Sequence, residues 1–331
     1  LVAIFGPTNA AAWGPAGPQQ VVLQAPVPCG PCAYVGHQVG LRNGCAAKTC
    51  LKLVTPDMVI AAARRLLVGE DYTPPPARRR RRTPPRAPAA TILGVRVDAV
   101  TFAGALERIE SFIAAKQPHQ IVTVNPEFVV AAQSDAVFRR ILNRAALAVA
   151  DGAGLLKAAA WLSQPPLPER IAGVDMVEAL AALAAQKGYR IFFLGAQPGV
   201  AEKAVAVLQA RYPGMASAGA FAGSPRAADE AAIVAKIQAA RPDIVLVAYG
   251  APEQDKWIAR NMHRLPASVL MGVGGAFDFI SGAARRAPRR LQRRNLEWLH
   301  RFIRQPWRWR RMWNAVPRFL WLVFWARRKT G

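Results

Sequence analysis

Short apolar runs alternate with longer stretches of helical periodicity through the middle of the chain. The runs predict strands at residues 92–95, 121–124, 147–150, 190–194, 244–248 and 269–273. Helices are expected from the capping residue Thr101 to 113, in a Val- and Ala-rich stretch after 126, from Asp175 to Gly188, and over 200–212, 224–240 and 257–265. Because the strands are continuous apolar runs, both faces of their sheet should be covered. The pattern predicts an α/β domain with a parallel sheet and helices on both faces.

Polar residues and glycines follow these predicted strands directly. They are Asn125, Asp151, Gly195, Gly250 and Gly275. In open parallel sheets, ligands bind beyond the carboxyl ends of the strands, where such residues gather. The sequence therefore predicts a functional site at this edge of the sheet.

Asp151 is the candidate with the most chemical content at that edge. A carboxylate after an apolar strand can orient a substrate hydroxyl or remove its proton, but it can equally cap a helix over 153–162. Thr123 and Asn125 end the neighbouring strand and could add hydrogen bonds to the same site. Asn125-Pro126 is also ordinary turn chemistry, and taken alone it favours a turn.

Two glycine-containing loops, 195–199 and 272–276, join strands to helices. Such loops let backbone N–H groups approach a phosphate, although many of them need glycine only for shape. The central body has no cluster of His, Cys and carboxylate residues with ligand spacing and no DxD motif. We therefore expect neither a catalytic metal nor another cofactor.

Charge is distributed unevenly along the 331 residues, which carry a net charge of +24 and are 52% apolar. The stretch 92–284 is nearly neutral, whereas 285–331 holds 15 basic residues and one acidic residue. The apolar content excludes a wholly disordered chain. The neutral body excludes a protein whose whole surface binds nucleic acid.

The tail, residues 285–331, also contains six of the nine tryptophans. Basic residues interleaved with tryptophan suit a helix lying at an anionic membrane surface, or alternatively nucleic acid with bases stacked on the rings. The apolar run 319–325 favours the membrane and is too short to span it. We expect no nucleic-acid partner.

The segment before the body has a different character. Residues 71–91 are rich in proline and arginine, which predicts a linker. This linker is either a solvated spacer or a segment that binds anionic lipid or RNA. All four cysteines, Cys29, Cys32, Cys45 and Cys50, precede it, and they fit either a zinc site or reduced thiols. The start of the chain lacks a basic segment with a cleavage site, so we expect no signal peptide and a cytoplasmic protein.

Several motifs occur in a fixed order: ILGVRVDAVT, VTVNPEF, VADGAGL, PLPERIAGVDM, FFLGAQPG, VAYGAPEQDKW, GVGGAFDFISG and the arginine-rich stretch from Arg286. With them, residues 92–314 resemble the WecG/TagA/CpsF family of bacterial glycosyltransferases. The resemblance implies transfer of an N-acetylmannosamine-type sugar or related hexose from a UDP-sugar to an undecaprenyl-diphosphate-linked sugar. It places the protein on the inner face of the cell membrane and leaves a monomer or a homo-oligomer open.

The same resemblance implies roles for individual residues. Asp151 matches the family's proposed catalytic base, with Thr123 and Asn125 as polar neighbours. Arg170 and Gln254, together with the strand-end glycines Gly195 and Gly250, are expected to bind substrate. Arg301, Arg308 and Arg311 match tail arginines that would meet the acceptor diphosphate. The mechanism implied is inverting transfer without a metal.

Residues 1–68 resemble a different family. LVAIFGPTNAAAWGP, CGPC and LVTPDMVIAAARRLL resemble the C-terminal end of ADP-heptose:lipopolysaccharide heptosyltransferases. The resemblance covers only the last part of that family's second Rossmann domain, so we interpret it as a remnant without activity of its own.

The expected organisation is an N-terminal α/β remnant (1–70), a linker (71–91), a Rossmann-like catalytic domain (92–284) and a basic, Trp-rich helical tail (285–331). Two other interpretations stay open at this point. One is a non-catalytic α/β protein that binds nucleic acid or membrane, and the other is an enzyme that retains heptosyl transfer as a second activity.

Overall fold

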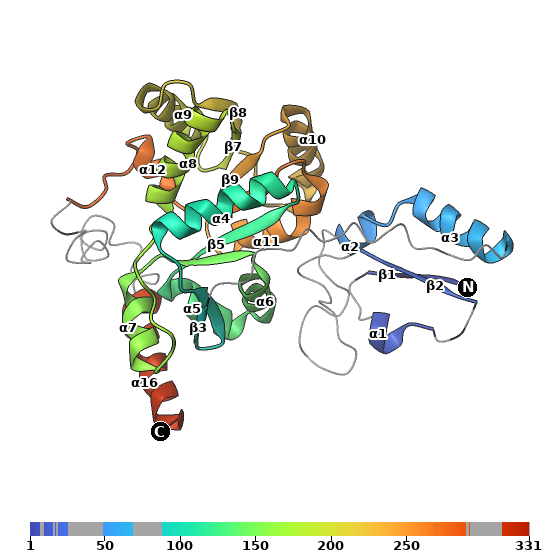
Figure 1. Cartoon of the computed structure of the whole chain (residues 1–331), viewed down its shortest axis with the longest axis horizontal. Helices are drawn as coiled ribbons and strands as arrows, with labels where there is room; N and C mark the ends of the chain where they lie inside the picture. The colour runs from blue at the N-terminus through green and yellow to red at the C-terminus, as the bar shows by residue number, and fades with distance from the viewer. Residues whose placement is uncertain are drawn as a thin grey trace.

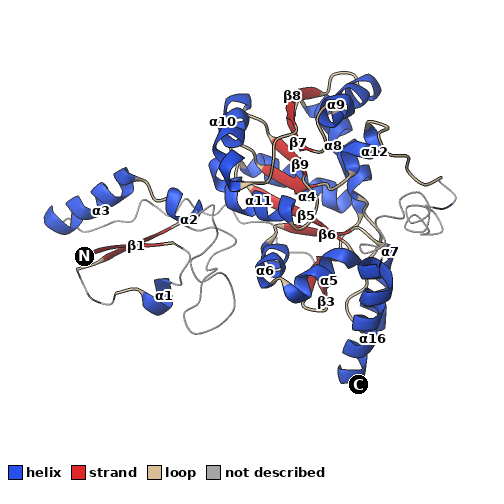
Figure 2. Ribbon diagram, turned by 180° about the vertical axis from the view of Figure 1, so that it is seen from behind, coloured by secondary structure: helices blue, strands red, loops and turns tan. Residues whose placement is uncertain are grey.

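A single parallel sheet organises the body of the chain. The computed structural model describes residues 1–6, 10–15, 17, 19–25, 49–68, 88–288, 291 and 313–330 (Figures 1 and 2). The strands are β5 (His119–Val124), β6 (Leu147–Ala150), β7 (Arg190–Gly195), β8 (Ala216–Phe221), β9 (Ile244–Ala248) and β10 (Val269–Gly272). They lie in the order β6-β5-β10-β9-β7-β8, and every neighbouring pair is parallel. The predicted α/β fold with a parallel sheet is confirmed.

Helices cover both faces of this sheet, as the apolar strands require. One layer consists of α4 (Phe102–Ala115), α8 (Gly173–Lys187), α9 (Val200–Arg211) and the short α12 (Ala276–Ile280). The other consists of α5 (Pro126–Ser134), α6 (Ala136–Arg144), α7 (Ala153–Trp161), α10 (Glu230–Ala240) and α11 (Glu253–Asn261). Successive strand residues face opposite layers, so Ile121 packs in the first and Val122 in the second.

The first predicted strand is wrong. The run 92–95 is the turn of a hairpin between β3 (Ala89–Ile92) and β4 (Val95–Asp98), because Leu93 and Gly94 both have positive φ, 50° and 79°. This hairpin covers the edge of the main sheet. The buried Asp98 carboxylate accepts a hydrogen bond at 2.8 Å from the backbone N–H of Ala148 in β6.

Other differences are smaller and have local causes. The stretch after 126 forms two helices, because Asp135 ends α5 and caps α6 by accepting from the N–H of Phe138. Helix α8 begins at Gly173, so Asp175 lies in its first turn and not at its cap. Strand β8 was not predicted, since its sequence ASAGAF has little hydrophobic character and lies half-exposed at the sheet edge.

Residues before the linker form a small α/β unit. Its strands β1 (Val2–Phe5) and β2 (Val21–Gln24) are parallel and are connected through α1 (Ala10–Trp13). Helices α2 (Thr49–Lys52) and α3 (Pro56–Val68) follow. Ala25 and the buried Cys50 pack against Ile141 of α6 and Ala259 of α11.

The described end of the tail is helical. A π-helical turn (Asn314–Arg318) leads into α16 (Phe319–Thr330), which lies beside α5 and α7 (Figure 1). Phe319 and Val323 on one side are buried in the core cluster shared with those helices. None of the helices in the described ranges is long and apolar enough to cross a membrane.

Candidate active site

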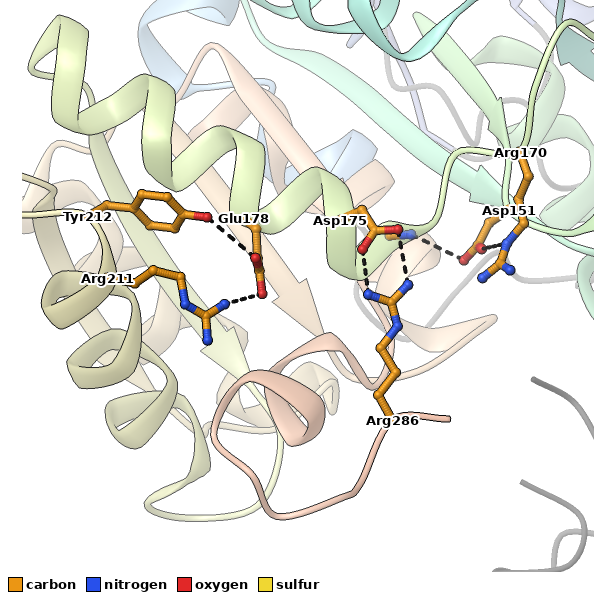
Figure 3. A network of polar contacts seen from close by, with 8 residues as sticks. Asp151, Arg170, Asp175, Glu178, Arg211, Tyr212 and Arg286 are labelled. Atoms are coloured by element: carbon orange, nitrogen blue, oxygen red, sulfur yellow. Dashed lines mark hydrogen bonds and ion pairs between the residues drawn. The ribbon is translucent and has the colours of Figure 1, made fainter. Parts of the chain in front are cut away.

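Asp151 follows β6 and faces the start of α8. Its Oδ2 accepts a hydrogen bond at 3.4 Å from the backbone N–H of Gly173, the first residue of α8, and its Oδ1 lies 3.9 Å from Nε of Arg170 (Figure 3). Gly152, and not Asp151, occupies the N-cap position of α7, so the capping interpretation is wrong for that helix. Asp151 is thus a partly exposed carboxylate, oriented by the positive end of one helix and by a guanidinium.

Arg170 reaches Asp151 because the segment between α7 and α8 is fixed at both sides. The N–H of Ile171 donates to the carbonyl of Ala150 at 2.7 Å, which attaches the segment to the end of β6. The adjacent Glu169 carboxylate accepts from the N–H of Phe102 at the start of α4. The structure therefore brings Arg170 beside Asp151, and its binding of substrate stays a prediction.

Thr123 lies against the same point from β5. Its side chain is buried, and its Oγ1 donates to the carbonyl of Gly272 at 3.2 Å, across the β5–β10 pair. A Cβ at Gly173 would lie 3.6 Å from Cγ2 of Thr123 and 3.7 Å from Oδ2 of Asp151. Thr123, Asp151 and the first residue of α8 are therefore neighbours, and the Thr123 hydroxyl has only acceptor capacity left.

Asn125 fills the capping role that its sequence context allowed, and its role in the site stays a prediction. Its Oδ1 accepts from the N–H of Phe128 at 3.0 Å and caps α5, as the turn interpretation predicts. Its Nδ2 makes no hydrogen bond to any residue in the described part of the chain. The side chain lies close to Gly152, since a Cβ there would be 3.9 Å from Cβ of Asn125. It can offer amide donors beside Asp151.

The loops after β7 and β9 lie at the same edge. Gly195 has φ 104°, and a Cβ on it would lie 2.7 Å from the carbonyl carbon of Ala248, so only glycine fits. This close approach lets the N–H of Ala196 donate to the carbonyl of Ala248 at 3.0 Å. Shape thus accounts for Gly195. At the end of the same loop Gly199 is the N-cap of α9 and leaves that helix without a side-chain cap.

Gln254 connects the loops after β9 and β10 from inside the protein. Its buried Oε1 accepts from the N–H of Gly250 at 3.2 Å and from the N–H of Gly274 at 2.9 Å. Gln254 therefore shapes the site edge by holding Gly250 and Gly274 together. Direct contact of Gln254 or Gly250 with substrate stays a prediction.

Sequence reasoning missed the neighbouring Asp255. This carboxyl is fully buried, and neither oxygen makes a well-formed hydrogen bond within the described residues. Burial raises the pKa of Asp255 to about 7, and the nearby Gln254 amide and its own backbone N–H lower it only in part. Helical spacing could have indicated that Asp255 is buried, because it lies on the same face of α11 as the buried Ile258.

Some predicted positions fall outside the described residues. They are Arg301, Arg308 and Arg311 of the tail and Cys29, Cys32 and Cys45 of the suggested zinc site. In the ranges that are described, no three His, Cys, Asp or Glu side chains come together as a metal site.

Comparison with known proteins identifies the family. The sequence profile described as "Glycosyl transferase WecG/TagA/CpsF family" matches residues 90–331. The chain is similar to the N-acetylglucosaminyldiphosphoundecaprenol N-acetyl-beta-D-mannosaminyltransferase of Staphylococcus aureus strain MW2, with 34% identity over 242 residues, 72% of this chain and 93% of that protein. The enzyme of the same name from strain NCTC 8325 / PS 47 matches with the same identity and coverage. The protein therefore belongs to the WecG/TagA/CpsF family of glycosyltransferases.

Proposed function

We propose that this glycosyltransferase moves an N-acetylmannosamine-type sugar from a UDP-sugar to N-acetylglucosaminyl-diphospho-undecaprenol, with inversion at the anomeric carbon. The observation that carries the proposal is the setting of Asp151, with the N–H of Gly173 at 3.4 Å and Arg170 at 3.9 Å. The acceptor and the sugar are those in the names of the Staphylococcus aureus relatives, which match over 93% of their length.

In this proposal Asp151 is the general base. Its carboxylate accepts the proton of the acceptor hydroxyl as that oxygen forms a bond to the anomeric carbon. The bond from the anomeric carbon to the diphosphate oxygen breaks in the same step, and UDP leaves with the electron pair. A single displacement of this kind inverts the anomeric configuration. The Gly173 N–H holds the carboxylate in place, and Thr123 lies on the β5 side of the same residue.

The departing diphosphate needs stabilisation by fixed positive groups. The N-terminus of α9 offers free backbone N–H groups at the end of the Gly195 loop, because no side chain caps it. Arg170 adds a guanidinium beside the base. We assign binding of the acceptor's own diphosphate to the tail arginines Arg301, Arg308 and Arg311.

A lipid-linked acceptor requires the enzyme to work at a membrane surface, and α16 is suited to that. We define its outer face as Leu320, Trp321, Phe324 and Trp325, all of which are exposed, with Trp321 at 59%. The opposite side of the helix is anchored by Phe319 and Val323. Arg318, Arg327 and Arg328 flank the outer face, and Arg328 lies over the rings of Phe324 and Trp325. We assign this face to anionic lipid headgroups on the cytoplasmic side.

For residues 1–68 we propose descent from a heptosyltransferase without retained activity. The parallel β1–β2 pair joined through a helix supports that origin, since it is the repeating unit of a Rossmann domain.

The experiment that tests the function is a donor screen. The full chain is incubated with a panel of UDP-sugars, with and without a short-chain analogue of N-acetylglucosaminyl-diphospho-undecaprenol, and UDP release is measured. We expect release that depends on the acceptor, fastest with UDP-N-acetylmannosamine. Release with no dependence on the acceptor, or none with any UDP-sugar, would overturn the proposal.

A further inference from the structure

Two carboxylates project from the first two turns of α8, and each pairs with an arginine from another element (Figure 3). Asp175 meets Arg286, with Nη1–Oδ1 at 2.5 Å and Nη2–Oδ2 at 3.0 Å. Glu178, one turn further along, meets Arg211 of α9. The Asp175 pair is bidentate, and it joins residues that are 111 positions apart in the sequence.

The Asp175 pair is set at the candidate catalytic centre. Asp175 is two residues from Gly173, whose N–H donates to Asp151. Arg286 belongs to the segment after α12, where the basic tail begins. This segment is also held by the N–H of Ala284, which donates to the carbonyl of Asp278 at 2.8 Å, and by the burial of Ala287. The first residues of the tail are therefore attached to the helix start that orients Asp151.

We infer that Asp175 and Arg286 are positioning residues, which fix the beginning of the tail beside Asp151 so that the lipid-diphosphate acceptor is bound in register with the base. This inference rests on the proposed function. Neither residue needs to touch the acceptor, because each acts through the position of the first residues of the tail, 284–288. Loss of the Asp175–Arg286 pair should therefore weaken binding of the acceptor and leave binding of the donor unchanged.

The test compares the variants Asp175→Asn and Arg286→Lys with the matched control Glu178→Gln. Asparagine removes the charge at constant shape, lysine keeps the charge and loses the bidentate fork, and the control breaks a similar ion pair on the same helix that does not involve the tail. In the transfer assay, KM for the short-chain acceptor should rise about threefold to tenfold in the first two variants. Their donor KM and kcat, and every constant of the control, should stay within about twofold.

The double variant Asp175→Asn/Arg286→Lys adds a coupling test. Because the two side chains form one interaction, its acceptor KM should exceed that of the worse single variant by no more than about twofold. An unchanged acceptor KM in both single variants would overturn the inference, as would an equal rise in donor KM or in the control.

Hydrogen exchange at the amide of Ala284 separates this inference from the proposed function. Exchange there should be faster in Asp175→Asn than in the parent or in Glu178→Gln, whether or not the protein transfers sugar. If the parent is inactive but this exchange increases, the proposed function fails and the attachment of the tail stands. If exchange does not change, the inference fails even in an active enzyme.

Discussion

Replacing Asp255 by asparagine should stabilise the protein at alkaline pH and not in acid. The carboxyl is fully buried, and burial raises its pKa from 3.8 to about 7. The folded state therefore holds this proton more tightly than the unfolded state, so this group lowers stability as pH rises from about 4 to about 7, with no further loss above that. Asparagine keeps the shape and cannot ionise, which removes the loss.

The magnitude follows from the size of the pKa change. About three pKa units at 1.36 kcal/mol per unit correspond to about 4 kcal/mol in all. About 2–3 kcal/mol of this falls between pH 5 and pH 8, because part of the loss already occurs below pH 5. The unfolding free energy of Asp255→Asn, relative to that of the parent, should rise by this amount over that range.

The assay is urea unfolding of both proteins at pH 5, 6, 7 and 8. The control is Glu253→Gln, which removes an exposed carboxylate from the first turn of the same helix. Taking the difference between variant and parent at each pH cancels every other titrating group that the mutation leaves alone. A difference that stays constant from pH 5 to pH 8, or one matched by the control, would refute the reasoning that burial dominates at Asp255.

Three further predictions concern other parts of the chain. Gly195→Ala should lower the unfolding free energy by about 2 kcal/mol or more, measured by urea unfolding, because its Cβ would meet the backbone of Ala248 at 2.7 Å; a neutral effect would contradict the strained geometry. Deleting residues 1–88 should lower Tm, because it uncovers part of α6 and α11. It should leave the rate of UDP-sugar transfer within about threefold of the parent, because it removes no site residue. A folded but inactive product would show that residues 1–88 take part in catalysis. Replacing the three aromatic residues of the α16 outer face, Trp321, Phe324 and Trp325, by serine should reduce co-sedimentation with anionic vesicles about tenfold or more and leave transfer to a short-chain acceptor intact. The control Leu67→Ser, at another exposed apolar position, should bind vesicles as the parent does. Equal vesicle binding by the parent and both variants would refute membrane docking through α16.

The sequence predicted the sheet well because its strands are buried on both faces. Runs such as 244–248 have no polar residue, so neither their type nor their place in the core is ambiguous. The prediction of a strand at 92–95 was wrong because Leu93 adopts positive φ, which cannot be predicted from a single apolar residue. Strand β8 was missed because it lies at the edge of the sheet, where a strand needs little hydrophobic character.

At the candidate site, position along the chain predicted which side chains gather but not what each one does. Asp151 and Thr123 both lie beside Gly173 because parallel strands end at one edge, and this grouping could be anticipated. Their contact with the start of α8 depends on how residues 162–172 return to the sheet, which local patterns do not encode. The roles of Gln254 and Asp255 were hidden for a related reason, since polar residues in an amphipathic helix are expected at the surface and here they are buried.

The most direct test of the account is the rate of transfer by Asp151→Asn. Asparagine retains an oxygen for the N–H of Gly173 and the shape of the side chain, and it loses the negative charge, which removes both the ability to accept the proton and the ion pair with Arg170. We predict that kcat for UDP-N-acetylmannosamine with the short-chain acceptor falls about 10²–10⁴-fold, with the dissociation constant for UDP and the unfolding midpoint unchanged. An Asp151→Asn variant that retains at least half of the parent rate would contradict the assignment of Asp151 as the base.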